Sequence, residues 1–135
     1  MDPFDPNNWV NDNHEYRIYG DDRASIWAVV DEIDYHWAIK YRWCIKLCRY
    51  QKPYLRRAVG VNQNGQRLRT FSLYLHIEIM KNTGIAPPGP AYKIVDHRNG
   101  NSLDCRRQNL RWATHSMNSR NVRGSHASEL FDLGV

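Results

Sequence analysis

A proline-rich segment near the middle of the chain most restricts how the chain can fold. Residues 85–91 read Ile-Ala-Pro-Pro-Gly-Pro-Ala, and proline lacks the backbone N–H that a helix interior or a central strand needs. The segment therefore predicts a stiff, non-helical connector with a domain boundary at its start. We expect residues 1–84 to form an N-terminal region, residues 85–124 a second module and residues 125–135 a tail.

Short strand-like runs, separated by turn signals, fill most of the region before the connector. Five such runs are rich in apolar and β-branched residues: 17–19, 24–30, 43–50, 54–61 and 67–73. The last two flank Asn64-Gly65, a dipeptide that strongly favours a hairpin turn. Two helices are expected among them, one capped by Asp31 and one over residues 74–82 that Gly84 is placed to end. This pattern predicts an antiparallel sheet with short helices.

The basic side chains lie in one continuous stretch. The chain has a net charge of +5, to which residues 1–39 contribute −7, residues 40–81 contribute +9, residues 82–124 contribute +5 and residues 125–135 contribute −2. A stretch with so large an excess of basic residues predicts a polyanionic partner such as a nucleic acid. Basic side chains that neutralise phosphates release counterions, which gives strong, salt-sensitive binding. A solvated basic face without a partner explains the charge equally well.

Arginines alternate with apolar residues along the predicted strands. Arg56, Arg57, Arg67 and Arg69 would give the antiparallel sheet one basic face, and a two-stranded ribbon can enter the major groove of double-stranded DNA. The alternative is a half-buried sheet whose outer face is only solvated. The acidic block of residues 1–39 would repel phosphates, so we expect it to pack away from DNA or to shield the basic surface.

Cysteine usage and the N-terminus exclude several classes of protein. Cys44, Cys48 and Cys105 are odd in number and form no CxxC pair, so neither a secreted disulfide framework nor a zinc knuckle is supported. The acidic start of the chain is not a signal peptide, and the longest clean apolar run, Ile26 to Val30, cannot span a bilayer. These features predict a cytoplasmic protein with reduced thiols and no membrane partner.

The residues after the connector predict a compact order of elements. They predict a strand over 93–97, a turn at Asn99-Gly100, a returning strand over 110–113 and a helix capped by Thr114. The order strand, turn, strand and helix would allow Asp96, His97 and Asn118 to converge.

This segment resembles the HNH endonucleases, in particular the members with asparagine in place of the last histidine. The resemblance rests on Val95-Asp96-His97, Asn99-Gly100-Asn101, Asn109-Leu110-Arg111 and Asn118-Ser119-Arg120-Asn121. Asn109 lies 12 residues after His97, and Asn118 lies nine residues after Asn109, spacings that fit the family. A looser likeness extends upstream over residues 74–76 and 30–35, a layout seen in phage- and intron-borne homing members.

The resemblance implies a ββα-metal finger and a role for each matched residue. It implies that His97 is the general base and that Asp96 and Asn118 are metal ligands, whose oxygen donors suit Mg²⁺ or Mn²⁺ better than Zn²⁺. Asn109 would orient His97 or brace the hairpin; a cap of a turn is an equally good interpretation of this residue. His76 is either the family's upstream histidine or a packed core residue. Three further arginines are expected to contact phosphates: Arg111, Arg120 and Arg123.

We therefore expect an α+β nuclease: an N-terminal antiparallel sheet with short helices that grips double-stranded DNA, joined to a C-terminal HNH finger that hydrolyses phosphodiester bonds. A single site of this kind cuts one strand, so a monomer would nick and a homodimer would break both strands. Two other interpretations stay open. One is a DNA-binding regulator whose nuclease site has decayed. The other is an RNA-binding module, since eight tyrosines and five tryptophans suit stacking on single strands.

Overall fold

A hairpin and a short helix form the N-terminal part of the molecule. In the computed structural model, which describes residues 15–20 and 23–122, strands β1 (Tyr16–Gly20) and β2 (Arg23–Val30) pair antiparallel, and α1 (Glu32–Ala38) follows them. The predicted hairpin and helix are confirmed. Apolar side chains from all three elements enter the core: Ile18, Ala28, Val30, Tyr35 and Ala38.

Asp31 stands at the predicted capping position of α1 but does not cap the helix. Its side chain makes no hydrogen bond to the first turn, and its Oδ2 instead accepts the backbone N–H of Arg107 at 2.8 Å. That N–H opens a short 3-10 helix (Arg107–Asn109), whose first donors lack partners within the helix. The expected side-chain cap is therefore wrong, because a donor from a distant segment takes the carboxylate.

The predicted strands of the middle region form one antiparallel sheet. It consists of β3 (Cys44–Leu47), β4 (Pro53–Gln63) and β5 (Gln66–Tyr74), with a short 3-10 helix (Arg49–Gln51) between β3 and β4. At the β4–β5 turn, Asn64 and Gly65 have φ values of 51° and 79°. This left-handed backbone is what a tight hairpin turn requires and what Asn-Gly accepts at low cost, so the predicted turn is confirmed.

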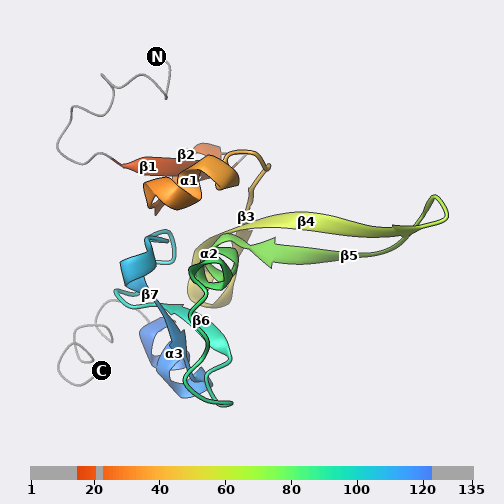
Figure 1. Cartoon of the computed structure of the whole chain (residues 1–135). Coiled ribbons are helices and arrows are strands. Elements are labelled where there is room, and N and C mark those ends of the chain that lie inside the picture. Colours follow the sequence, from red (N-terminus) through yellow and green to blue (C-terminus); the bar gives the residue numbers. More distant parts are fainter. Residues whose placement is uncertain (1–14, 21–22, 123–135) are drawn as a thin grey trace.

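Strands β4 and β5 continue beyond β3 as a two-stranded ribbon that projects from the rest of the molecule (Figure 1). Cross-strand partners define its two faces, because directly opposite residues share a face. The outer face carries Lys46, Tyr54, Arg56, Ala58, Gly60, Asn62, Arg67, Thr70, Ser72 and Tyr74. The inner face carries Ile45, Leu55, Arg57, Val59, Val61, Arg69, Phe71 and Leu73.

The expectation of a single basic face is wrong for the four predicted arginines. Arg56 and Arg67 lie on the outer face, whereas Arg57 and Arg69 lie on the inner face. Arg56 and Arg57 are successive residues, which point to opposite faces of any regular strand. Arg67 and Arg69 are separated by a β-bulge between β4 and β5, which changes the alternation of side chains along β5.

The last elements follow the predicted order. Helix α2 (Leu75–Thr83) ends at Gly84, whose φ is 75°, and is followed by β6 (Ile94–His97), β7 (Leu110–Ala113) and α3 (His115–Val122). Strands β6 and β7 pair antiparallel. The Thr114 hydroxyl accepts the backbone N–H of Met117 at 3.2 Å, so the predicted cap of α3 is confirmed.

One buried cluster joins the parts of the chain on either side of residue 85. It includes Trp43, Leu55 and Ile79 before that residue and Val95 and Leu110 after it. Figure 1 shows β1, β2 and α1 at one end, β6, β7 and α3 at the other, and α2 between them. Separate helices and small antiparallel sheets confirm the α+β class. No helix in residues 15–20 and 23–122 is long and apolar enough to cross a bilayer.

Candidate active site

The end of β6 presents two neighbouring polar side chains to different surroundings. Successive residues of a strand point to opposite faces, so Asp96 and His97 diverge although they are adjacent in sequence. Asp96 pairs with Arg111 across the β6–β7 ladder, and His97 pairs with Leu110. Both side chains are almost fully buried, with 2% of Asp96 and 4% of His97 exposed.

The carboxylate of Asp96 is held by donors from a strand and from a helix. Its Oδ2 accepts Nε of Arg111 at 3.0 Å and Nδ2 of Asn121, in α3, also at 3.0 Å. Burial raises the pKa of Asp96 above its ordinary value, and the hydrogen bonds from Arg111 and Asn121 limit that rise. The site thus supplies a buried carboxylate with its own cationic and amide partners.

Asn121 fastens α3 to β6. Besides Asp96, its Nδ2 donates to the backbone carbonyl of His97, and the side chain is buried. Sequence reasoning missed this role, although Asn121 belongs to the motif that carries the HNH resemblance. The available signal was spacing: Asn118 and Asn121 are three residues apart and therefore share one face of α3.

Asn118 lies one turn before Asn121 and lines a cavity of about 220 Å³. The other side chains around this cavity come from the segment after β3 and from β4, β5, α2 and β6: Cys48, Tyr54, Tyr74, His76, Ile77, Ile94 and Val95. Helix α3 packs against β6, so Asn118 sits on the helix that contacts Asp96. The hydrogen bond to Asp96 itself, however, comes from Asn121.

His97 belongs to a cluster of four rings. Its ring centroid lies 4.9 Å from that of His76 and 5.8 Å from that of Tyr54. The centroid of His76 lies 5.2 Å from that of Tyr54 and 5.9 Å from that of Tyr74. His76 is thus both packed in the interior and in contact with the predicted general base, so the two interpretations of this residue are compatible.

Burial keeps both imidazoles of this cluster neutral at neutral pH. It lowers the pKa of His97 to about 4, with Asp104 acting in the opposite direction and Lys52 adding to the decrease. Burial also lowers the pKa of His76 well below its ordinary value, and the neighbouring His97 adds to this decrease. A neutral imidazole has a lone pair with which it can accept a proton.

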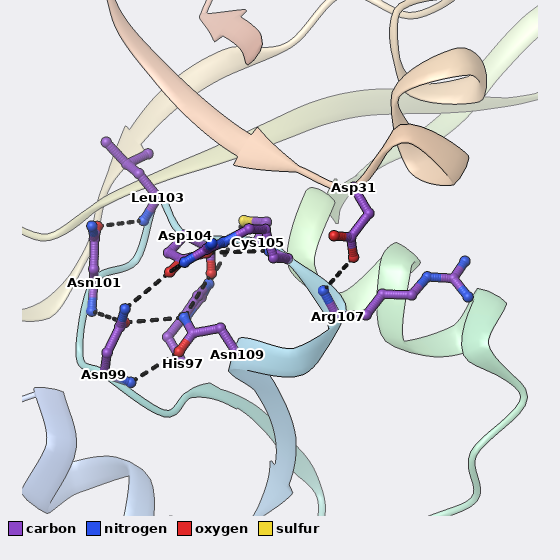
Figure 2. Close-up of polar contacts among 10 residues, drawn as sticks. Asp31, His97, Asn99, Asn101, Leu103, Asp104, Cys105, Arg107 and Asn109 are labelled. Carbon is purple, nitrogen blue, oxygen red and sulfur yellow. Dashed lines mark hydrogen bonds and ion pairs between the residues drawn. The ribbon is translucent and has the colours of Figure 1, made fainter. Parts of the chain in front are cut away.

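Asn109 braces the loop between β6 and β7, as Figure 2 shows. Its Oδ1 accepts the backbone N–H of Asn99 at 3.1 Å, and its Nδ2 donates to Oδ1 of Asn99 at 3.0 Å and to the carbonyl of Asp104 at 2.8 Å. Its own carbonyl accepts the backbone N–H of Arg98 at 2.7 Å. These bonds fix the chain that follows His97.

Comparison with protein-family models agrees with this geometry. Residues 76–120 match the model for HNH endonucleases. This segment belongs to the HNH endonuclease family. The predicted resemblance is confirmed, and the match begins at His76 in α2 and ends at Arg120 in α3. No curated protein and no solved structure matches the chain.

Two contacts hold the start of β4 against the loop of the HNH segment. Lys52 donates through Nζ to the carbonyl of Gly100 at 2.5 Å. The hydroxyl of Ser102 donates to the carbonyl of Pro53, also at 2.5 Å. The first residues of β4 therefore lie directly beside the loop of the HNH segment.

The three arginines that were predicted to contact phosphates after the connector lie in different surroundings. Arg111 is engaged by Asp96, and Arg120 lies in the last turn of α3. Arg123 lies outside the described residues.

The donor chemistry of Asp96 and Asn118 fits the predicted kind of metal ion. One carboxylate and one amide oxygen are hard donors of the type that Mg²⁺ and Mn²⁺ prefer, with water and substrate completing the coordination. Among the residues that the structure describes, no three His, Cys, Asp or Glu side chains form a metal-binding group.

Proposed function

We propose that the chain is a DNA endonuclease that hydrolyses phosphodiester bonds with the help of Mg²⁺ or Mn²⁺. The observation that carries this proposal is the end of β6, where Asp96 supplies a buried carboxylate and the next residue, His97, supplies a buried neutral imidazole. Asn121 of α3 holds this strand end by donating to the Asp96 carboxylate and to the backbone carbonyl of His97. The nuclease class itself follows from the match of residues 76–120. Metal dependence and DNA as the substrate are the proposed refinements.

Each side chain has a separate task in this proposal. Asp96 and Asn118 hold the metal ion, which when bound neutralises charge on the phosphate and the leaving oxygen. His97 accepts a proton from the attacking water through its neutral imidazole. Asn109 acts as a positioning residue, because its hydrogen bonds fix the loop after His97.

The basic stretch supports DNA as the substrate. Residues 40–81 contribute +9 to the net charge, and duplex DNA binds such a surface by counterion release. A single HNH site accounts for one cut strand, so nicking is the expected activity of a monomer, and a homing-type double-strand break needs a homodimer.

The test is single-turnover nicking of a supercoiled plasmid across a titration of Mn²⁺. General-base catalysis contributes about 10²- to 10⁴-fold to a rate, so His97→Ala should lose about that factor at every Mn²⁺ concentration. Asp96→Asn and Asn118→Ala should lose activity through weaker metal binding, which excess Mn²⁺ partly restores. His115→Ala, an exposed histidine at the start of α3, serves as the control and should cut at the wild-type rate.

Several outcomes would contradict the proposal. Wild-type protein that cuts no plasmid in Mg²⁺ or Mn²⁺ would favour a regulator with a decayed site. Cleavage of single-stranded RNA but not of plasmid would favour RNA as the substrate. A His97→Ala protein that cuts at the wild-type rate would remove His97 from the mechanism.

A further inference from the structure

Arg67 and Arg69 point in opposite directions although they are two residues apart. In a regular strand they would share a face, but Arg69 pairs with Val61 and Arg67 pairs with Asn62, its neighbour in β4. The position of the Arg67 side chain agrees with this register. A Cβ added at Gly60, which is on the outer face, would lie 2.8 Å from Cζ of Arg67. A β-bulge of this kind redirects a side chain.

The inner face of the β3–β5 sheet is already occupied where it joins the rest of the molecule. Leu55 is part of the buried core, and Ile45 packs against it. The guanidinium of Arg57 stacks on Tyr41, with Cζ 3.8 Å from the ring centroid, and lies 5.8 Å from the centroid of Trp43. The inner face therefore serves packing at its base.

The centre of the outer face, which we call its floor, carries only small side chains and lies between basic ones. Its central residues are small and exposed: Ala58, Gly60, Thr70 and Ser72. Lys46, Arg56 and Arg67 flank this floor, and no residue that defines the outer face is acidic. Glycine and other small residues in a strand permit another backbone to approach closely.

The outer face also leads to the cavity of the HNH segment. Tyr54 and Tyr74, at the base of this face, line the cavity together with His76 and Asn118. Arg56 lies directly opposite Tyr74, so the basic side chains begin where the cavity wall ends. A bound polymer can therefore contact both without crossing an acidic surface.

The spacing of the basic side chains fits duplex DNA. Arg56 and Asn62, the partner of Arg67, are six residues apart, which corresponds to about 20 Å along a strand. The major groove is about 12 Å wide and admits a two-stranded ribbon. The small floor can then lie in the groove while an arginine at each end reaches a phosphate.

We propose that the outer face of the β3–β5 sheet is the surface that binds duplex DNA and directs it to the HNH cavity, through Arg56 and Arg67 rather than Arg57 and Arg69. This proposal rests on the proposed function, since it names the DNA-binding surface of that same nuclease. The proposal gives different roles to Arg67 and Arg69, which a regular alternation of side chains would place on the same face.

The test compares Arg67→Ala with Arg69→Ala, two changes of equal charge in one exposed strand. Binding to a short DNA duplex is measured by fluorescence anisotropy in EDTA over a range of salt concentrations. Arg67→Ala should weaken binding and reduce the log–log salt slope by about 0.9, the value for one lost phosphate contact. Arg69→Ala should leave both quantities unchanged. Circular dichroism should show the same thermal midpoint for both proteins.

A second variant changes shape without changing charge. Ala58→Tyr adds a bulky side chain to the exposed floor of the outer face, and tyrosine is well tolerated in strands. We expect at least tenfold weaker duplex binding, with an unaltered thermal midpoint. Unchanged binding by Ala58→Tyr, or equal effects of Arg67→Ala and Arg69→Ala, would overturn the proposed surface. Equal or tighter binding of a matching RNA duplex would overturn the assignment to DNA.

Failure of this inference and failure of the nuclease proposal give different results. A chain that binds duplex DNA in the predicted pattern but never nicks plasmid retains the binding surface and contradicts the nuclease. A chain that nicks plasmid but is weakened by Arg69→Ala alone contradicts the surface and retains the nuclease.

Discussion

At the scale of single residues, Asn118 and Asn121 have the same chemistry but different surroundings. Asn118 lines the cavity beside His76, whereas Asn121 is buried and donates hydrogen bonds to Asp96 and to the carbonyl of His97. A buried hydrogen-bonded amide stabilises the fold, because its removal leaves buried acceptors without a donor. An amide that faces a cavity is free to serve a ligand.

We predict that Asn121→Ala destabilises the protein and that Asn118→Ala does not. Loss of the buried amide should lower the free energy of unfolding by about 1–3 kcal/mol, the desolvation penalty of an unsatisfied buried group. Asn118→Ala should instead weaken Mn²⁺-dependent nicking at nearly constant stability. Urea denaturation in EDTA measures the stability of both variants. Equal unfolding free energies for the two would show that their roles are not separated in this way.

The buried histidines predict a loss of stability in mild acid. An unfolded histidine has a pKa of about 6.5, and burial lowers the pKa of His97 to about 4. Between these values the unfolded chain binds more protons, so the free energy of unfolding decreases as pH falls below 6.5. For His97 alone the loss at pH 5 is about 2 kcal/mol. His76 changes stability in the same direction, and Tyr54 and Tyr74, which face it, titrate only at alkaline pH.

Urea denaturation at pH 7 and pH 5 measures this effect. His76→Gln cannot gain a proton at this position, so its stability should change less between the two pH values than that of the wild type. His115→Ala should show the full wild-type dependence. If the His76→Gln protein loses as much stability as the wild type, the titration of His76 does not contribute.

At the scale of elements, local signals predicted what forms but not how every side chain is used. The Asn64-Gly65 turn, the end of α2 at Gly84 and the cap of α3 at Thr114 were predicted correctly. Each of these features is caused by residues that are close together in the sequence, so a short stretch of sequence is enough to predict it. Asp31 was misjudged because its partner, the backbone of Arg107, is 76 residues away.

The candidate site shows the same division between local and distant causes. Spacing predicted Asp96, His97, Asn109 and Asn118, because the HNH motif fixes their order along the chain. The contact between His97 and His76 depends instead on the packing of α2 against β6. The bulge that separates Arg67 from Arg69 was not predictable from alternation, since an alternating pattern assumes a regular strand.

At the scale of the whole molecule, the N-terminal part and the HNH segment form one structure. The backbone of Val29 in β2 accepts the N–H of Cys105 and donates to the carbonyl of Leu103, both at 2.8 Å. Figure 2 shows Arg107 next to Asp31 on the neighbouring segment. Two carboxylates of the acidic block, those of Asp31 and Asp34, thus bind the HNH loop.

The ion pair between Asp34 and Arg107 is a bidentate link between the two parts. Arg107 donates to the carboxylate through Nε at 2.8 Å and Nη2 at 2.9 Å. Asp34 is fully buried, with 0% of its side chain exposed, whereas 29% of the Arg107 side chain is exposed. The pair is asymmetric, because Arg107 can still reach water without its partner and Asp34 cannot.

We predict that this asymmetry appears in the stability of single variants. Arg107→Ala leaves a buried carboxylate without its counter-charge and should lower the free energy of unfolding by about 3–5 kcal/mol. Asp34→Asn should cost less, because it removes the buried charge and leaves the partly exposed guanidinium solvated. The double variant should be more stable than Arg107→Ala alone, since no unpaired buried carboxylate remains. Urea denaturation of the three proteins measures this. Additive losses in the double variant would mean that the two side chains act independently and that the link between the parts lies in the backbone of β2.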